Sequence, residues 1–125
     1  MGTFTYKIAI APLTDGDFQE LDVLVDGRST YMQVPGSVLE RIGVIPDDRV
    51  PFMLADGTVT KYPVAEVRLR LDGHTADTLC VFGDEGTHSI LGSLALKALG
   101  LAVDQEHGRL VRVPGLPVSP REVAP

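Results

Sequence analysis

The sequence predicts a mainly β domain, a small barrel-like fold with two short helices. Apolar and polar residues alternate in several short segments, which is the pattern of strands with one buried face. The chain has 13 glycines and nine prolines in 125 residues, so turns are frequent. The strands are too many and too short for a doubly wound parallel sheet.

The N-terminal third predicts two paired strands and a helix. Residues 6–12 (YKIAIAP) and 20–26 (ELDVLVD) form a hairpin around a polar turn that contains Asp-Gly. Residues 35–44 (PGSVLERIGV) follow as a short helix, which Pro35 and Gly36 open and Gly43 ends.

The middle of the chain predicts further strands. Residues 50–64 (VPFMLADGTVTKYPV) form a hairpin around Ala55-Asp56-Gly57, because an Asp-Gly pair favours hairpin turns. Residues 65–73 (AEVRLRLDG) alternate strictly and then turn at Asp72-Gly73, and residues 77–83 (DTLCVFG) form a buried strand. The inward positions of the alternating segment are Val67, Leu69 and Leu71, and the outward positions are Arg68 and Arg70.

The C-terminal third predicts the second helix and a last hairpin. Residues 84–100 (DEGTHSILGSLALKALG) have apolar side chains at helical spacing, which we expect to pack in the core, and Gly100 is a good C-cap. These side chains are Leu91, Leu94, Ala95, Ala98 and Leu99. Residues 101–113 (LAVDQEHGRLVRV) turn near His107-Gly108. We place the domain at residues 1–114 and a Pro-rich C-terminal tail at 115–125.

Composition excludes several classes of partner. The formal net charge is −6 and no basic stripe is present, so we expect no nucleic-acid binding. No apolar run approaches the length of a membrane span, and we expect no membrane partner. The single cysteine, Cys80, excludes an internal disulfide, and the N-terminus lacks a charged leader followed by a long apolar segment. We therefore expect a cytoplasmic protein.

The sequence gives no reason to expect a metal ion or a cofactor. The three histidines, His74, His88 and His107, fall in predicted turns without ligand spacing, so we expect them at the surface. The acidic segment 83–86 (GDEG) lacks the further ligands of a cation site. Cys80 lies in a predicted buried strand without a nearby histidine signature, so we expect a core residue rather than a nucleophile.

The candidate functional site is the turn that follows the second strand, within LVDGRSTYMQVP (24–35). The apolar run Val23–Val25 leads directly into Asp26, and Gly27 and Arg28 follow. An acid at this place can cap the backbone N–H groups of its own turn, or it can serve as an acid or base in a cleft.

The order of motifs resembles the bacterial retropepsin-like aspartic peptidases, a single-domain branch of the retroviral-type family. Segment 23–44 is similar to the family's acidic turn, and segment 54–73 to its flap hairpin and the strand that follows. Segment 83–115 is similar to its C-terminal half, with Ile90-Leu91-Gly92 opening a helix that ends in ALGL. The resemblance spans about residues 5 to 114. It implies the closed β-barrel of the acid protease fold and a symmetric homodimer.

The same resemblance implies a catalytic role for Asp26. In this family each chain contributes one aspartate to a shared pair that holds a single proton. One carboxylate acts as general base on a water molecule, and the other, protonated, polarises the peptide carbonyl. The residues implied in substrate binding are Gly27, Arg28 and Ser29 in the turn and Ala55, Asp56, Gly57 and Thr58 at the tip of the flap.

The turn departs from the family's Asp-Thr-Gly, because this chain has Asp26-Gly27-Arg28. Gly27 lacks the hydroxyl that hydrogen-bonds across the family's dimer. Arg28 places a cation beside the acids, and an opposite charge within about 4–6 Å lowers the pKa of a carboxylate by about 1–3 units. That effect opposes proton sharing, although Ser29 and Thr30 offer replacement hydroxyls.

Three functions are compatible with this turn. The first is peptide hydrolysis in a dimer cleft through Asp26 of each chain. The second is a repurposed enzyme that acts on a small molecule, with Asp26 as acid or base and Arg28 holding an anionic group. The third is an inactive pseudo-peptidase that binds a peptide strand by β-augmentation.

Overall fold

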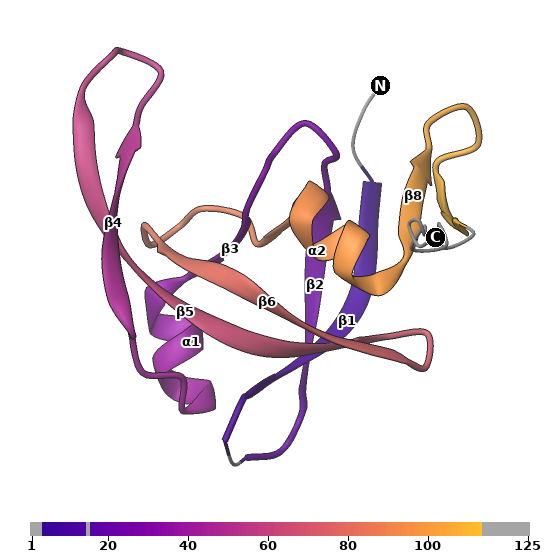
Figure 1. The fold of residues 1–125 in the computed structure, drawn as a ribbon, viewed down its shortest axis with the longest axis horizontal. Coiled ribbons are helices and arrows are strands. Elements are labelled where there is room, and N and C mark those ends of the chain that lie inside the picture. Colours follow the sequence, from indigo (N-terminus) through magenta and orange to yellow (C-terminus); the bar gives the residue numbers. More distant parts are fainter. Residues whose placement is uncertain (1–3, 15, 114–125) are drawn as a thin grey trace, which may run out of the picture.

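The computed structural model describes residues 4–14 and 16–113, and the predicted Pro-rich tail lies outside these residues. The described part is mainly β with two short helices, as predicted (Figure 1). In chain order the elements are β1 (Phe4–Pro12), β2 (Gln19–Val25), β3 (Met32–Pro35), α1 (Gly36–Ile42), β4 (Asp48–Met53), β5 (Val59–Leu71), β6 (His74–Gly83), β7 (Ile90–Leu91), α2 (Ser93–Leu99), β8 (Leu101–Asp104) and β9 (Arg109–Arg112).

Seven of these strands form one sheet in the order β1-β2-β7-β3-β6-β5-β4, and β1 pairs with β5 as well as with β2. The second pairing runs from Ala9 opposite Arg70 to Pro12 opposite Val67. Two pairs are parallel, β2 with β7 and β3 with β6. Strands β8 and β9 form a separate antiparallel hairpin, as predicted.

The core is aliphatic, as the scarcity of aromatic residues requires. In β5 the alternation is confirmed: Val67, Leu69 and Leu71 are buried, and Arg68 reaches outward to Asp77, with 3.0 Å between Nε and Oδ1. The segments predicted separately as 50–64 and 65–73 share one continuous strand, β5. Cys80 is fully buried in β6, as predicted.

Helix α1 confirms the start and end signals in the sequence. It begins directly after Pro35, and Gly43 ends it with a φ of 102°, a left-handed conformation that L side chains rarely adopt. The Gly43 N–H donates to the carbonyls of Leu39 and Glu40, which closes the last turn. The sequence of residues 35–44 therefore predicted the start and the end of this helix correctly.

Helix α2 is shorter than the pattern over 84–100 indicated. Ser93 is its first residue, because residues 84–89 form a loop and Ile90–Leu91 pair as strand β7. The expectation that the whole apolar stripe is core was wrong for two residues. Leu94 is 40% exposed and Ala98 is exposed, because they share the face of this two-turn helix that points away from the core.

The β4–β5 hairpin projects from the body of the molecule, and the turn after β2 rises on the same side of the fold (Figure 1). The hairpin's last paired residues are Met53 and Val59, which leaves 54–58 as its tip. Neither helix of the described residues has the length and apolar character needed to span a lipid bilayer.

Candidate functional site

Strands β2 and β7 position Asp26. The parallel pairing ends with Val25 opposite Leu91, and the next N–H, that of Asp26, donates to the Leu91 carbonyl at 3.1 Å. The Ser29 N–H donates back to the Asp26 carbonyl, also at 3.1 Å, and closes the turn. The backbone that carries Asp26 is therefore held from both sides.

The start of α2 fixes the other end of this turn. The N–H groups of Ser93 and Leu94 donate to the carbonyls of Ser29 (2.7 Å) and Thr30 (3.0 Å). Gly92 makes this approach possible, since a Cβ there would lie 2.7 Å from the carbonyl oxygens of both Ser29 and Tyr31. A side chain at position 92 has no room, so the glycine of the Ile90-Leu91-Gly92 motif has a steric cause.

The Asp26 carboxylate faces its own turn. Its Oδ1 accepts the backbone N–H of Arg28 at 3.0 Å, and the Arg28 Nε lies 3.3 Å from the same atom. The Asp26 side chain is 18% exposed, whereas that of Arg28 is 78% exposed. The predicted proximity of cation and acid is thus present within one chain.

A cleft with a volume of about 390 Å³ lies beside this turn, and the residues that follow the turn in sequence line it. It runs between the segment after Asp26 and the part of the β4–β5 hairpin next to its tip, where residues 52–54 and Tyr62 line it. Of the predicted binding residues, Ser29 lines it. The other lining residues are Thr30, Tyr31, Gln33, Phe52, Met53, Leu54, Tyr62, Val81, Gly83 and Asp84. Most of these were missed, because their convergence depends on long-range strand pairing.

Three aromatic side chains form the walls of the cleft. The rings of Tyr31 and Phe52 lie 5.4 Å apart with an interplanar angle of 83°, and those of Phe52 and Tyr62 lie 6.0 Å apart at 61°. The Tyr62 hydroxyl donates to Oδ2 of Asp84 at 3.1 Å, and this hydrogen bond raises the pKa of Tyr62. The chain has only seven aromatic residues, and three of them meet at this site.

The predicted flap-tip residues Ala55, Asp56, Gly57 and Thr58 are exposed and do not line the cleft of the single chain. The Asp56 carboxylate accepts the Thr58 N–H (3.0 Å) and hydroxyl (2.7 Å), and these bonds lower the pKa of Asp56. The flanking Met53 is 74% exposed. The tip is therefore an ordered turn, and its contact with substrate stays a prediction.

Gly27 faces a different hollow from Ser29. This second hollow has a volume of about 470 Å³ and is lined mainly by apolar residues of α2, β8 and the end of the described chain, among them Leu96, Val103 and Val113. The turn thus separates two concavities, the aromatic cleft on one side and the apolar hollow on the other. Gly27 is not brought together with the other predicted substrate-binding residues.

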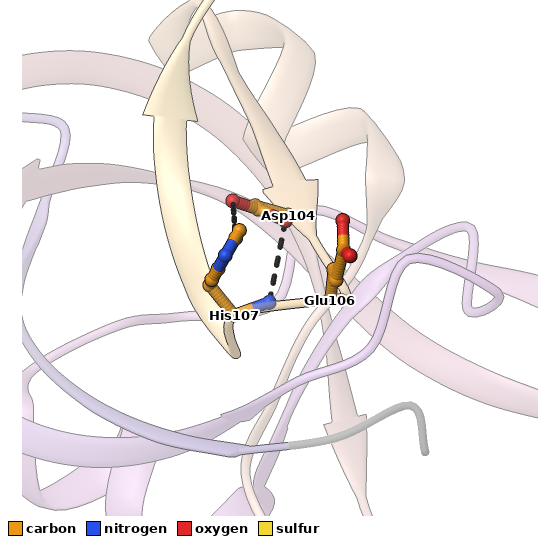
Figure 2. Close-up of side chains that lie close together, drawn as sticks. All are labelled: Asp104, Glu106 and His107. Carbon is orange, nitrogen blue, oxygen red and sulfur yellow. Dashed lines mark hydrogen bonds and ion pairs between the residues drawn. The ribbon is translucent and has the colours of Figure 1, made fainter.

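The last hairpin gathers Asp104, Glu106 and His107 (Figure 2), with potential ligand atoms within 4.8 Å of one another. The Asp104 Oδ2 already accepts from His107 Nδ1 (2.9 Å) and from Arg109 Nε (3.1 Å), and these partners lower the pKa of Asp104. The guanidinium next to this carboxylate opposes a bound cation. We interpret the cluster as a brace across the β8–β9 turn, and we assign no metal to it.

The sequence predicted the histidines at the surface and Cys80 in the core. His88 is exposed, whereas His74 is half-buried at the start of β6, with its Nε2 3.1 Å from Nη1 of Arg112. Burial raises the pKa of the Cys80 thiol to about 12, so this group lacks the thiolate that a nucleophile needs.

No protein-family model matches the chain, and no curated protein has a significant match to its sequence. The likeness to retropepsin-like peptidases stays a prediction drawn from the motifs.

Proposed function

We propose that the protein is a retropepsin-like aspartic peptidase homologue that processes an extended peptide as a symmetric homodimer, with Asp26 of each chain at a shared cleft. One observation supports this most. The turn that carries Asp26 is hydrogen-bonded to β7 and to the start of α2, where only a glycine fits at position 92, and it lies next to a cleft that the β4–β5 hairpin also lines. The β1–β5 pairing fits the closed barrel of the acid protease fold.

In the proposed dimer, apolar side chains that are exposed on the single chain would be buried between the two copies. One chain offers one turn carboxylate and a hairpin whose apolar Met53 and Val59 are 74% and 62% exposed. Leu94 on α2 is 40% exposed, and the hollow beside Gly27 is lined mainly by apolar residues. Exposed apolar patches of this kind are typical of an interface between copies.

The proposed chemistry needs two carboxylates. The ionised Asp26 takes a proton from a water molecule as the water oxygen bonds to the peptide carbonyl carbon, and the protonated Asp26 gives its proton to the carbonyl oxygen. Breakage of the C–N bond then releases a new carboxyl group and a new amine, with the amine nitrogen receiving a proton from the pair. The hairpins close over the substrate and exclude bulk water.

Arg28 favours a second candidate function, acid–base chemistry on a small anionic molecule. Its Nε contacts Asp26 while the side chain stays 78% exposed, so the outer N–H groups of the guanidinium face solvent. A guanidinium in this position can bind a carboxylate or phosphate. In this case Arg28→Gly abolishes the reaction, whereas the same change increases peptide cleavage under the first proposal.

A peptide-library digest between pH 4 and 7 tests the main proposal, with Asp26→Asn as the matched inactive control. We expect cleavage by the dimer, inhibition by pepstatin and loss of cleavage in the control. The absence of any cleavage across this range by a confirmed dimer refutes a peptidase. Peptide binding that Asp26→Asn leaves unchanged, without cleavage, supports the pseudo-peptidase instead.

The buried reduced thiol of Cys80 fits the expected cytoplasmic location.

A further inference from the structure

Asp84 is the acid at the aromatic end of the cleft. It follows β6 directly, lines the cleft with Tyr31, Phe52 and Tyr62, and its Oδ2 is held by the Tyr62 hydroxyl. Within the described residues, no lysine or arginine forms an ion pair with Asp84. The cleft therefore presents a carboxyl group with no cationic partner among the residues that the structure describes.

The surrounding rings suit a cation. Each aromatic ring has a negative face, and the steep angles between neighbouring rings, 83° and 61°, turn their faces in different directions, as the walls of a cage do. A cationic group near such faces is attracted by the ring quadrupoles, and a carboxylate at the same place adds a charge-assisted hydrogen bond. The chain's net charge of −6 also attracts cations to this surface.

The shape of the cleft suits a long side chain with a charged end. Apolar atoms of Phe52, Leu54 and Val81 line it together with the polar Gln33 and Asp84. Gly83 leaves space for the Gln33 side chain, because a Cβ at position 83 would lie 2.8 Å from the Gln33 Cγ. A lysine or arginine has an aliphatic stem for the apolar wall and a cationic end for Asp84.

We propose that this cleft is a specificity subsite that selects a lysine or arginine side chain, with Asp84 as the specificity-determining residue and Tyr31, Phe52 and Tyr62 as its cation-binding walls. The ligand's identity as a peptide rests on the function proposed above. Because the segment from Ser29 to Tyr31 lines the cleft directly after Asp26, the selected side chain lies close to the bond that would be cleaved.

Calorimetric titration tests the subsite separately from catalysis. Two peptides that differ only in one position, lysine against norleucine, are titrated into the Asp26→Asn protein, which binds without cleavage. We expect about tenfold tighter binding of the lysine peptide, the size expected for one cation–π contact with one solvent-exposed ion pair. Asp84→Asn should reduce the preference to about threefold, and Phe52→Leu should reduce it as well.

Glu66→Gln is the matched control, because Glu66 is an exposed acid of β5 that does not line the cleft. It should leave the lysine preference unchanged while it removes one negative charge. Equal binding of the two peptides, or no binding of either one, overturns the subsite. A lysine preference that depends on Asp84 in a protein without peptidase activity supports the subsite and refutes only the proposed cleavage. Cleavage without a preference for basic residues supports the proposed peptidase activity and refutes the subsite.

Discussion

Gly92→Ala tests how the acid turn is held in place. In the folded chain the added methyl group would lie 2.7 Å from the carbonyl oxygens of Ser29 and Tyr31 and 2.9 Å from that of Thr30. All three atoms belong to the backbone, so no side-chain rotation relieves the contact. Gly92 has a φ of −94°, which alanine adopts freely, and the effect is therefore purely steric.

The expected cost follows from these contacts. Overpacking in a well-packed region costs about 1–3 kcal/mol. A shift of the backbone also lengthens the hydrogen bonds from Ser93 to Ser29 and from Leu94 to Thr30, each of which contributes about 1 kcal/mol net. We expect the free energy of unfolding to fall by about 3 kcal/mol, and Tm by about 10–15 °C for a chain of this size.

Thermal and urea unfolding followed by far-UV circular dichroism measures this loss at one fixed protein concentration, since dimerisation would make stability depend on concentration. Gly36→Ala is the control. Its Cβ would have no neighbour closer than 3.7 Å, at the start of α1, and we expect unchanged or slightly higher stability. A loss of less than about 1 kcal/mol in Gly92→Ala, below the range for overpacking, would refute the close approach of the turn backbone to Gly92.

Two further predictions concern groups outside the cleft. Burial and the raised pKa of Cys80 should keep it unreactive toward an aromatic disulfide reagent at pH 8, with one thiol released on unfolding; rapid labelling of the native protein would contradict the packing. Because His107 and Arg109 lower the pKa of folded Asp104, its contribution to stability is present above the unfolded pKa of about 4 and is lost as pH falls through the folded value. Asp104→Asn should therefore lower Tm at pH 7 and leave it unchanged at the lowest pH, and an equal loss at both would contradict the brace.

Local signals in the sequence predicted most elements. The Asp-Gly turns marked the hairpins, and Gly43 and Gly100 marked the helix ends, where both adopt left-handed backbone conformations. Strand β7 could not be predicted in this way, since two residues show no periodicity and Ile90–Leu91 become a strand only through pairing with β2 and β3. The same missing strand explains why the helical pattern over 84–100 was too long.

The candidate site was predictable only in its local part. The sequence predicted the contact between Asp26 and Arg28, which are two residues apart and share one turn. It did not predict the cleft, because Tyr31, Phe52 and Tyr62 converge through the pairing of β3 with β6 and of β5 with both β6 and β4. Such contacts depend on tertiary register rather than on any pattern along the chain.

Crosslinking at position 26 tests most directly whether two Asp26 residues meet. In the Asp26→Cys protein, buried Cys80 does not compete for reagent. We expect a short thiol–thiol crosslinker to give a covalent dimer in high yield, while the control Thr75→Cys, an exposed position beside the β5–β6 turn, stays monomeric. Equal yields for the two variants, or a strictly monomeric protein in sedimentation under the same conditions, would contradict the shared cleft.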